Sequence, residues 1–586
     1  MDSSNFYTVN LCDSRIAHIK SQIPFAVESG SQQCTFQSFP SSSISPANII
    51  YNIQVPSMST CIDRNVLQQA TITATISCTN VPTGQLAFNY GMTDALQAFP
   101  LNSLITTQMA TVNNTTVTVN LQDILPQVLR MYDHDKLIRY NSTAPSLPDL
   151  FFYNYSDAVG TQSNPLSSFS NMSFSNTEIP RGAFPIRIIQ VAHFVGGAYT
   201  DTQLVSTADT DTWKIIIQFT TIEPLLALSP FCNSDSNDQA CFLGINNMSL
   251  QFNIDQSCKR MFSSARDYIT NIQLGATTQS VNNVASVTYP AFQACSILLN
   301  FLSLQPEQYA KINAKNVLSY LDMPRFLYSN SNALNAGQSQ VIQFSNIQLN
   351  MVPDLMIIVA RKPMAQQNWS DSSSFLTIQG ITINFNNHSG ILSSANQSQL
   401  YHLSQKNGSS QSWYEYMGNA LANNNTTGVP AIIPSLGSLL VLNPTMDFGL
   451  DSMYSASSQG QFNLQFALSV YNQSGENFAP EICLICVNSG MFITENGTSQ
   501  TQLGLLTREV VLKTKNERSV DMDSSYYKRL IGGNLSNLKA LCHVFRKPDN
   551  NEYASNNNKE AEASGMCASG MDAGHMPRRL HRFVKK

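Results

Sequence analysis

The sequence predicts an all-β protein made of two duplicated sandwich or jelly-roll domains, with short helices and a basic, largely non-β C-terminal tail. Short segments that alternate polar and apolar side chains recur along most of the 586 residues, and a period of two is typical of strands with one buried face. Charged residues make up only 12% of the chain, about half the usual ~25%. A pair of repeated strand patterns indicates the duplication.

The clearest strand pattern covers residues 461–470, where polar or small residues alternate with large apolar ones for ten positions. Similar runs occupy residues 70–77, 116–121, 213–219, 248–254, 341–351 and 375–385, and segments rich in turn-forming residues lie between them at 41–46, 233–238, 329–338 and 472–477. Many short strands joined by polar loops predict sandwiches or jelly rolls.

Two strand patterns recur in the same order and at nearly equal offsets. Residues 217–222 (IQFTTI) match 342–347 (IQFSNI), and residues 245–253 match 378–386. We therefore expect duplicated β-domains with a boundary near 257–281. The predicted division is an N-terminal arm at 1–25, a first jelly roll at 26–265, a second at 266–512 and a tail at 513–586.

Helical patterns are few. One has apolar residues at helical spacing after a candidate cap at Asn120, with Pro126 as a competing start; its residues are Leu121, Ile124, Leu125, Val128 and Leu129. A second lies in the tail and consists of Leu535, Leu538, Leu541 and Phe545.

The net charge of −5 is unevenly spread. Residues 508–586 hold 15 of the 33 Lys and Arg but 9 of the 38 Asp and Glu. The acidic body is therefore not expected to bind nucleic acid over a broad face, whereas the tail is a candidate. The N-terminus lacks a signal-peptide pattern, and no apolar run approaches the ~18 residues of a spanning helix. We expect a protein that is not secreted, whose 12 Cys behave as small apolar residues. Its glycosylation sequons are expected from an Asn/Ser/Thr-rich composition alone.

The motifs that would carry catalysis or metal binding are weak. The sequence has no Walker loop, HExxH, GxSxG or GxGxxG pattern. We interpret residues 133–135 (DHD) as a solvated turn, Cys483 and Cys486 as a buried thiol pair, Cys232 and Cys241 as flanks of a hairpin, and residues 209–211 (DTD) as a loop. The expectation is a protein with no catalytic, cofactor or metal site, although a hydrolase with two carboxylates in a cleft stays open.

Several segments resemble virophage major capsid proteins. Residues 30–40 (GSQQCTFQSFP), 49–56 (IIYNIQVP) and 62–64 (IDR) resemble the opening of these proteins, and residues 98–103 (AFPLNS) and 223–231 (EPLLALSPF) fit the same group. Residues 353–361 (PDLMIIVAR) and 457–463 (SSQGQFN) resemble the second jelly roll of this group and of its Polinton-like virus and large DNA virus relatives. The likeness covers residues 25–512.

The resemblance implies a non-enzymatic double jelly-roll coat protein. Its homotrimers would form pseudo-hexagonal capsomers that tile an icosahedral shell of a DNA virus or virus-like element. The expected partners are further copies of the chain and minor capsid or penton proteins, and the expected location is the virion, assembled inside the host cell. The alternative is a carbohydrate-binding or adhesive spike, which would expose a cluster of Trp and Tyr; the candidates are Trp369, Trp413, Tyr414 and Tyr416.

The tail contains one candidate processing site. Residues Leu530, Ile531, Gly532, Gly533 and Asn534 resemble the cleavage pattern of adenovirus-type maturation proteases, which implies a viral cysteine protease that cuts after Gly533. Two glycines let the backbone extend into a narrow groove without a side-chain clash. The other interpretation is a turn before the helix at Leu535. The released piece would carry a charge of +4 and would contact DNA, a scaffold or an internal membrane.

Overall fold

The computed structural model describes residues 6–10, 24–28, 37–58, 60–90, 94–148, 184–195, 198–201, 204–231, 241–264, 267–274, 277–279, 287–289, 291–304, 316–423, 430–449, 456–504 and 506–507. The tail from residue 513, with its predicted helix and the Leu530–Asn534 motif, lies outside these residues. So does most of the N-terminal arm.

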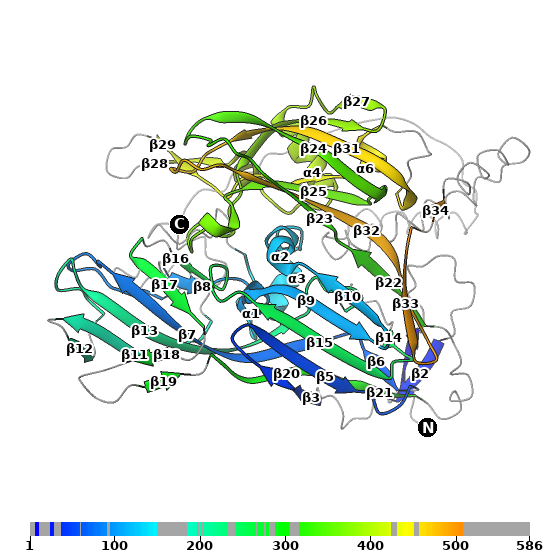
Figure 1. Ribbon diagram of the computed structural model, residues 1–586, viewed down its shortest axis with the longest axis horizontal. Helices are drawn as coiled ribbons and strands as arrows, with labels where there is room; N and C mark the ends of the chain where they lie inside the picture. The colour runs from blue at the N-terminus through cyan, green and yellow to red at the C-terminus, as the bar shows by residue number, and fades with distance from the viewer. Residues whose placement is uncertain are drawn as a thin grey trace, which may run out of the picture. The chain divides into compact units, whose positions relative to one another are not determined.

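The first jelly roll is built from eight antiparallel strands that are divided equally between two sheets (Figure 1). In chain order they are β3 (Gln37–Pro40), β5 (Asn48–Gln54), β7 (Leu67–Thr79), β9 (Ile105–Val112), β10 (Thr115–Val119), β13 (Thr212–Pro224), β15 (Asn247–Ile254) and β20 (Phe292–Leu299). If they are counted from one to eight, one sheet has the order 1-8-3-6 and the other 2-7-4-5. Strands β4 (Ser43–Ile44), β11 (Arg187–Val195) and β12 (Ala198–Asp201) extend the sheet edges.

The second jelly roll repeats this order. Its strands are β23 (Arg325–Ser329), β24 (Ser339–Met351), β25 (Leu355–Arg361), β26 (Thr377–Phe385), β27 (His388–Ile391), β30 (Leu440–Leu442), β31 (Ser458–Tyr471) and β32 (Glu481–Glu495). The sheets again read 1-8-3-6 and 2-7-4-5. Along β31 every second side chain from Phe462 to Val470 is buried, as the alternation at 461–470 predicts. The prediction of two jelly rolls is confirmed.

The repeat that suggested the duplication pairs strands that are not equivalent. Residues 217–222 lie on β13, the sixth strand of the first jelly roll, whereas 342–347 lie on β24, the second strand of its partner domain. The other match joins β15, a seventh strand, to β26, a fourth strand. Strands with one buried face share the same alternation whatever their place in a sheet, so the motif match was wrong although the duplication is real.

The 1-8-3-6 sheet of the second jelly roll has two apolar faces. In β25, the side chains of Leu355, Ile357 and Val359 belong to the hydrophobic core that includes the core residues of the first jelly roll. The alternate side chains, those of Met356, Ile358 and Ala360, belong to the core of the second jelly roll. The same alternation divides residues 482–487 of β32 between the two cores. We call this sheet the shared wall. Burial on both faces explains why its strands are continuous apolar runs.

Three strands beyond residue 266 pair with the N-terminal half. They are β17 (Ile269–Gln273) and β20, which pair with β7, and β21 (Phe301–Leu304), which pairs with β6 (Cys61–Asp63) and β2 (Pro24–Glu28). The predicted division after residue 265 separates these strands from their partners. That division relied on the mismatched repeat.

Short helices connect the strands. They are α1 (Pro100–Leu104), α2 (Leu121–Leu129), α3 (His134–Leu137), α4 (Gln397–Lys406), α5 (Trp413–Met417) and α6 (Pro444–Asp447), with 3-10 turns η2 (Ile138–Tyr140) and η6 (Met364–Gln366). Helix α2 begins at Leu121, and Pro126 lies inside it rather than at its start. Sequence reasoning missed α4 and α5, although each begins with a capping box, Asn396 with Gln399 and Ser412 with Glu415. No described helix is long and apolar enough to cross a membrane.

The remaining strands are short. They are β1 (Phe6–Asn10), β8 (Asp94–Leu96), β14 (Cys241–Phe242), β16 (Phe262–Ser264), β18 (Thr277–Gln279), β19 (Val287–Tyr289), β22 (Asn316–Asp322), β28 (Asn419–Asn423), β29 (Pro430–Pro434), β33 (Thr498–Leu503) and β34 (Leu506–Thr507). Strands β22 and β33 both pair with the second half of β32.

Candidate functional site: the contact between the two jelly rolls

The acidic residues of the weak motifs at 133–135 and 209–211 accept hydrogen bonds that hold turns and loops together. Asp133 accepts a hydrogen bond from the backbone N–H of Asp135 in the turn before α3. Asp209 accepts from Thr83, and Asp211 accepts from Thr207 and Ala208, so both carboxylates tie loops together. Within the described ranges, no group of three His, Cys, Asp or Glu is placed to hold a metal ion.

The cysteines are buried thiols. Cys483 faces the core that contains the first jelly roll and Cys486 faces the second core, so the two side chains of the CxxC motif point to opposite faces of β32. Burial raises the pKa of both thiols. Cys241 lies with its Sγ 3.3 Å from that of Cys61, on the neighbouring strand β6. Its predicted hairpin partner Cys232 lies outside the described residues.

The four candidate aromatic residues do not form an exposed cluster. Trp413 packs edge-on against Tyr401 with ring centroids 5.3 Å apart, and Tyr416 is fully buried beside the same ring. Trp369 packs against the core that contains the first jelly roll. Only Tyr414 of the four is exposed, so this arrangement lacks the stacking platform that a sugar-binding spike needs.

A buried charge cluster, which the sequence analysis missed, joins the jelly rolls. Arg361, at the end of β25, contacts Asp123 of helix α2 and donates from Nε to Glu481 Oε1 at 3.0 Å. Arg325, at the start of β23, also contacts Asp123. The Arg361 and Asp123 side chains are each 1% exposed. A carboxylate between two guanidinium groups fixes α2 of the first jelly roll onto the shared wall.

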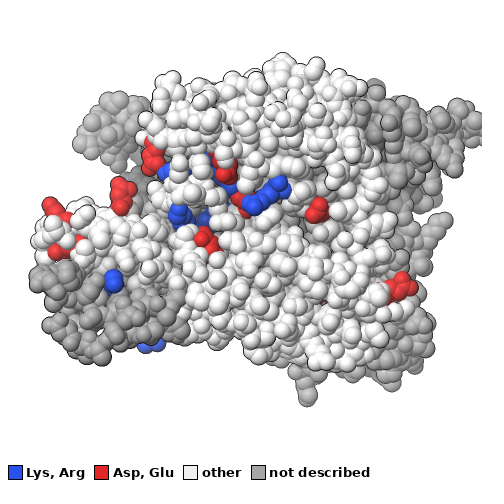
Figure 2. Space-filling model, viewed as in Figure 1, with Lys and Arg blue, Asp and Glu red and all other residues white. Residues whose placement is uncertain are grey.

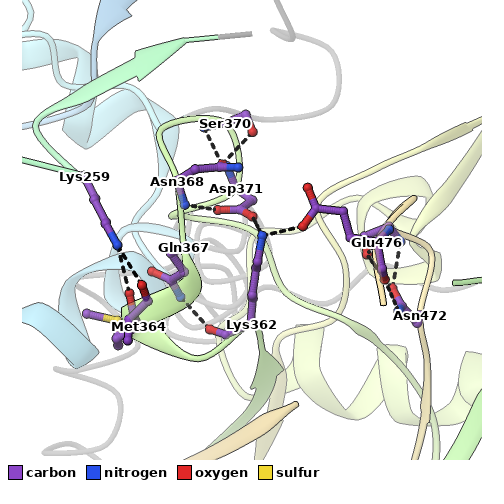
Figure 3. Close-up of polar contacts among 11 residues, drawn as sticks. Lys259, Lys362, Met364, Gln367, Asn368, Ser370, Asp371, Asn472 and Glu476 are labelled. Atoms are coloured by element: carbon purple, nitrogen blue, oxygen red, sulfur yellow. Dashed lines mark hydrogen bonds and ion pairs between the residues drawn. The ribbon is translucent and has the colours of Figure 1, made fainter. Parts of the chain in front are cut away.

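The loop between β25 and β26 contacts the first jelly roll and is held in place by ion pairs and hydrogen bonds of its own (Figure 3). Lys259 of the first jelly roll donates to the carbonyl oxygen of Ala365 at 3.1 Å. Lys362 pairs with Asp371 at 2.8 Å and with Glu476. Asp371 also accepts from the N–H of Asn368 at 2.7 Å. These bonds give the loop one defined conformation against its neighbour.

Arg130, which follows α2, holds the far end of that loop. Its Nη1 donates to the carbonyl of Pro126 at 2.7 Å and its Nη2 to the carbonyl of Ser373 at 2.9 Å. The guanidinium lies 5.1 Å from the centroid of the Phe375 ring. Figure 2 shows that charged side chains on this face gather mainly near the meeting of the two jelly rolls, and that the described surface around them is largely uncharged.

Two buried carboxyl groups anchor the segments that resemble capsid proteins. Glu223 accepts hydrogen bonds from the N–H groups of Leu101 and Asn102 and from the Asn102 side chain, each at 2.8 Å, and from Thr221. It thereby joins residues 98–103 to residues 223–231. Asp354 accepts from the N–H of Ser489 at 2.9 Å. Burial raises the pKa of Glu223 to about 7 and that of Asp354 to about 6, against the opposing effect of these hydrogen bonds.

Comparison with known proteins gives consistent matches over both halves of the chain. Residues 4–302 match the Sputnik virophage major capsid protein first domain, and residues 323–490 match the major capsid protein V20 C-terminal domain. The capsid protein V20 of Sputnik virophage is 25% identical over 522 residues, which cover 87% of this chain and 82% of that protein.

Two solved structures share the fold. The 3.5 Å cryo-EM structure of the Sputnik virophage aligns with a TM-score of 0.66 and 22% identity, covering 86% of this chain and 94% of that one. The crystal structure of the mavirus major capsid protein aligns with a TM-score of 0.60 and 17% identity, covering 84% and 94%.

Proposed function

Because this chain belongs to the Sputnik virophage major capsid protein family, a family of structural virion proteins, we propose that it assembles as a homotrimer. The trimer forms a pseudo-hexagonal capsomer, and such capsomers tile the icosahedral shell of a DNA virus or virus-like element. The observation that carries the proposal is the pair of jelly rolls with one strand order, held in one compact unit. Three copies present six similar sandwiches, which suits a near-sixfold tile.

The chemistry of the surface supports contacts between copies that are mostly uncharged. Figure 2 shows a largely uncharged face, and large apolar side chains are exposed at Leu327, Val341, Ile432 and Met446. Removing water from such a surface costs little free energy when the surface is buried against another copy. Six-lobed tiles cannot occupy fivefold vertices, so the shell also needs minor capsid or penton proteins there.

The oligomeric state tests this proposal. The full-length chain, purified and measured by light scattering, should have a mass of about 194 kDa, three times 64.6 kDa. Negative-stain images should show particles with a hexagonal outline. A chain that stays monomeric at assay concentrations well above those of a virus-producing cell would contradict the proposal, and binding of that monomer to a glycan array would favour the adhesive alternative.

We further infer that a viral cysteine protease removes the end of the tail by cutting after Gly533. The motif lies beyond β34, the last described strand, so the cut would remove no described element of either jelly roll. The released residues 534–586 carry 9 Lys and Arg against 5 acids. That charge suits a temporary contact with DNA, a scaffold or an internal membrane before maturation.

The intact mass of the protein in mature particles tests the cleavage. Loss of 53 of 586 residues from a 64.6 kDa chain removes about 5.8 kDa. A Gly533→Val variant should keep its full mass, whereas the Gly196-Gly197 pair, which has Phe194 in place of Met, Ile or Leu, should stay uncut in both proteins. Full-length protein in particles made with an active protease would leave Gly532 and Gly533 as a turn.

A further inference from the structure

Two buried thiols lie in contact on neighbouring strands of the N-terminal half. The Sγ of Cys241, on β14, donates a hydrogen bond to the Sγ of Cys61, on β6, at 3.3 Å. Cys61 is 0% exposed and Cys241 is 1% exposed, and both are free thiols. They are 180 positions apart, so the contact joins two distant parts of the chain.

The pairing of the two strands places both thiols on one face. Strands β6 and β14 are antiparallel, with Cys241 opposite Asp63. Cys61 lies two residues before Asp63, and side chains two residues apart in a strand project from the same face. The thiols are therefore diagonal neighbours across the two strands. The S–S bond of a disulfide is about 2.05 Å long, so the two sulfurs need to approach by only about 1.2 Å from their distance of 3.3 Å.

The CxxC motif of the sequence lacks this geometry. Cys483 and Cys486 point to opposite faces of β32, so rotation of their side chains cannot join them. The close pair is the one that the sequence spacing did not single out, because its members lie on strands that are paired only in the fold.

Strand β14 also leads into contacts with the second half of the chain. The carbonyl oxygen of Cys241 accepts a hydrogen bond from the Asn316 side chain at 3.1 Å. The N–H of Leu243 donates to the Asn316 side chain at 3.3 Å, and the Leu243 carbonyl accepts from the Thr494 hydroxyl. Asn316 begins β22, and Thr494 is near the end of β32. A covalent bond at Cys241 would therefore tie β6 to the segment that holds β22 and β32.

We propose that Cys61 and Cys241 form a disulfide when the protein passes from the reducing interior of a cell to oxidising surroundings. The oxidant is a low-molecular-weight disulfide. The thiolate of one cysteine attacks it and releases one small thiolate, and the thiolate of the other cysteine attacks the mixed disulfide and releases the second. The two cysteine protons end on the two released thiols. A virus particle that leaves its host makes this passage, so the timing rests on the proposed function, whereas the bond itself does not.

The reduced pair is protected while the chain stays folded. The hydrogen bond with Cys61, together with burial, raises the pKa of the Cys241 thiol well above its usual range. Exchange requires a thiolate and access for the oxidant. The folded protein should therefore react slowly, through local opening of these strands, and the bond should then persist after the segment closes again.

Peptide mapping by mass spectrometry tests the bond. Reduced full-length protein is held in glutathione disulfide at a urea concentration just below its unfolding midpoint, where local opening admits the reagent, and is digested without reductant. The wild type should yield a linked peptide that contains Cys61 and Cys241 and is lighter than its two parts by two hydrogen atoms. The urea midpoint of the oxidised protein should rise by on the order of 0.5–1 M, because the bond closes a long loop in the unfolded chain.

Two variants separate this bond from other effects of oxidation. Cys61→Ala should lose both the linked peptide and the rise in the urea midpoint. Cys486→Ala, which removes a buried thiol from the second core, is the matched control and should keep both.

Absence of the linked peptide from the oxidised wild type would overturn the proposal, and so would a peptide that joins Cys241 to Cys232 in its place. An oxidised Cys61→Ala protein whose midpoint rises as much as that of the wild type would refute the stabilising role. These measurements do not depend on assembly. A chain that forms the bond but stays monomeric would contradict the shell proposal alone, and a trimer without the bond would contradict this inference alone.

Discussion

Replacing Arg361 by methionine is expected to destabilise the folded chain by about 3–5 kcal/mol, the usual cost of removing one partner from a buried ion pair. Methionine keeps an unbranched apolar stem but removes the guanidinium. Asp123 then retains Arg325, whereas Glu481, which is 10% exposed, loses the only ion-pair partner it has among the described residues. The expected loss is therefore mainly the cost of a buried carboxylate left alone.

Lys362→Met provides a matched control, since it removes the same charge from the adjacent residue. The carboxylates that pair with Lys362 belong to Asp371 and Glu476, whose side chains are 25% and 58% exposed. Water can solvate them when the ammonium group is lost, and the expected change is only ~0–1 kcal/mol.

Urea unfolding followed by tryptophan fluorescence measures the difference between the two variants. The unfolding midpoint of Arg361→Met should fall well below that of Lys362→Met, and adding Glu481→Gln to Arg361→Met should recover part of the loss. Equal midpoints for Arg361→Met and Lys362→Met would refute the reasoning that burial of the partner carboxylate sets the cost.

Three further predictions concern pH, thiols and salt. The raised pKa values of Glu223, about 7, and Asp354, about 6, mean that the folded chain binds these protons more tightly than the unfolded chain does. Their contribution to the unfolding free energy is therefore greatest below about pH 4 and falls as pH rises to 7, by on the order of 3 kcal/mol for each group. In Glu223→Gln, the urea unfolding midpoint should depend less on pH between pH 5 and pH 8 than it does in the wild type. An unchanged pH dependence of the midpoint would contradict this. Cys483 and Cys486 should not react with a thiol reagent until the chain unfolds, because both are buried and protonated; rapid labelling of the native chain at either position would count against their burial. The proposed trimer should persist in moderate salt, since its contacts are expected to be uncharged; dissociation by salt alone, seen by light scattering, would disprove that expectation.

The position of the domain boundary also remains a proposal that can be tested. The pairing of β20 and β21 with the first jelly roll leads us to place the boundary between Leu304 and Asn316 rather than after residue 265. Limited proteolysis should leave a resistant core that ends near Thr514. A stable fragment that ends between residues 150 and 200 would contradict the division.

Local patterns carried most of the fold prediction, because a strand with one buried face shows that face in its own sequence. The alternation at 461–470 predicts β31, and the apolar spacing after Asn120 predicts α2. The same reasoning could not identify which strands of the two domains are equivalent, because all half-buried strands share this alternation. The order of strands in a sheet depends on pairings between distant segments, which no single segment encodes.

The buried charge cluster was missed for a related reason. Asp123 and Arg361 are 238 positions apart, so no local pattern pairs them. One signal was available: an arginine that closes the apolar run 355–360, and an aspartate inside an apolar helix, are charges in segments that must be buried. Such charges need partners, although the sequence does not say which ones.

The shared wall has a consequence for the order of events during synthesis. The first jelly roll has all its strands once residue 304 has been made, but the strand β32 that covers its apolar side ends only at residue 495. At about 5–20 residues per second, roughly 10–40 s separate the two moments. During that interval a nascent chain presents an uncovered apolar face, on which ribosome-associated chaperones can act. A chain that ends before Glu481 lacks β32 and leaves that side of the first core uncovered.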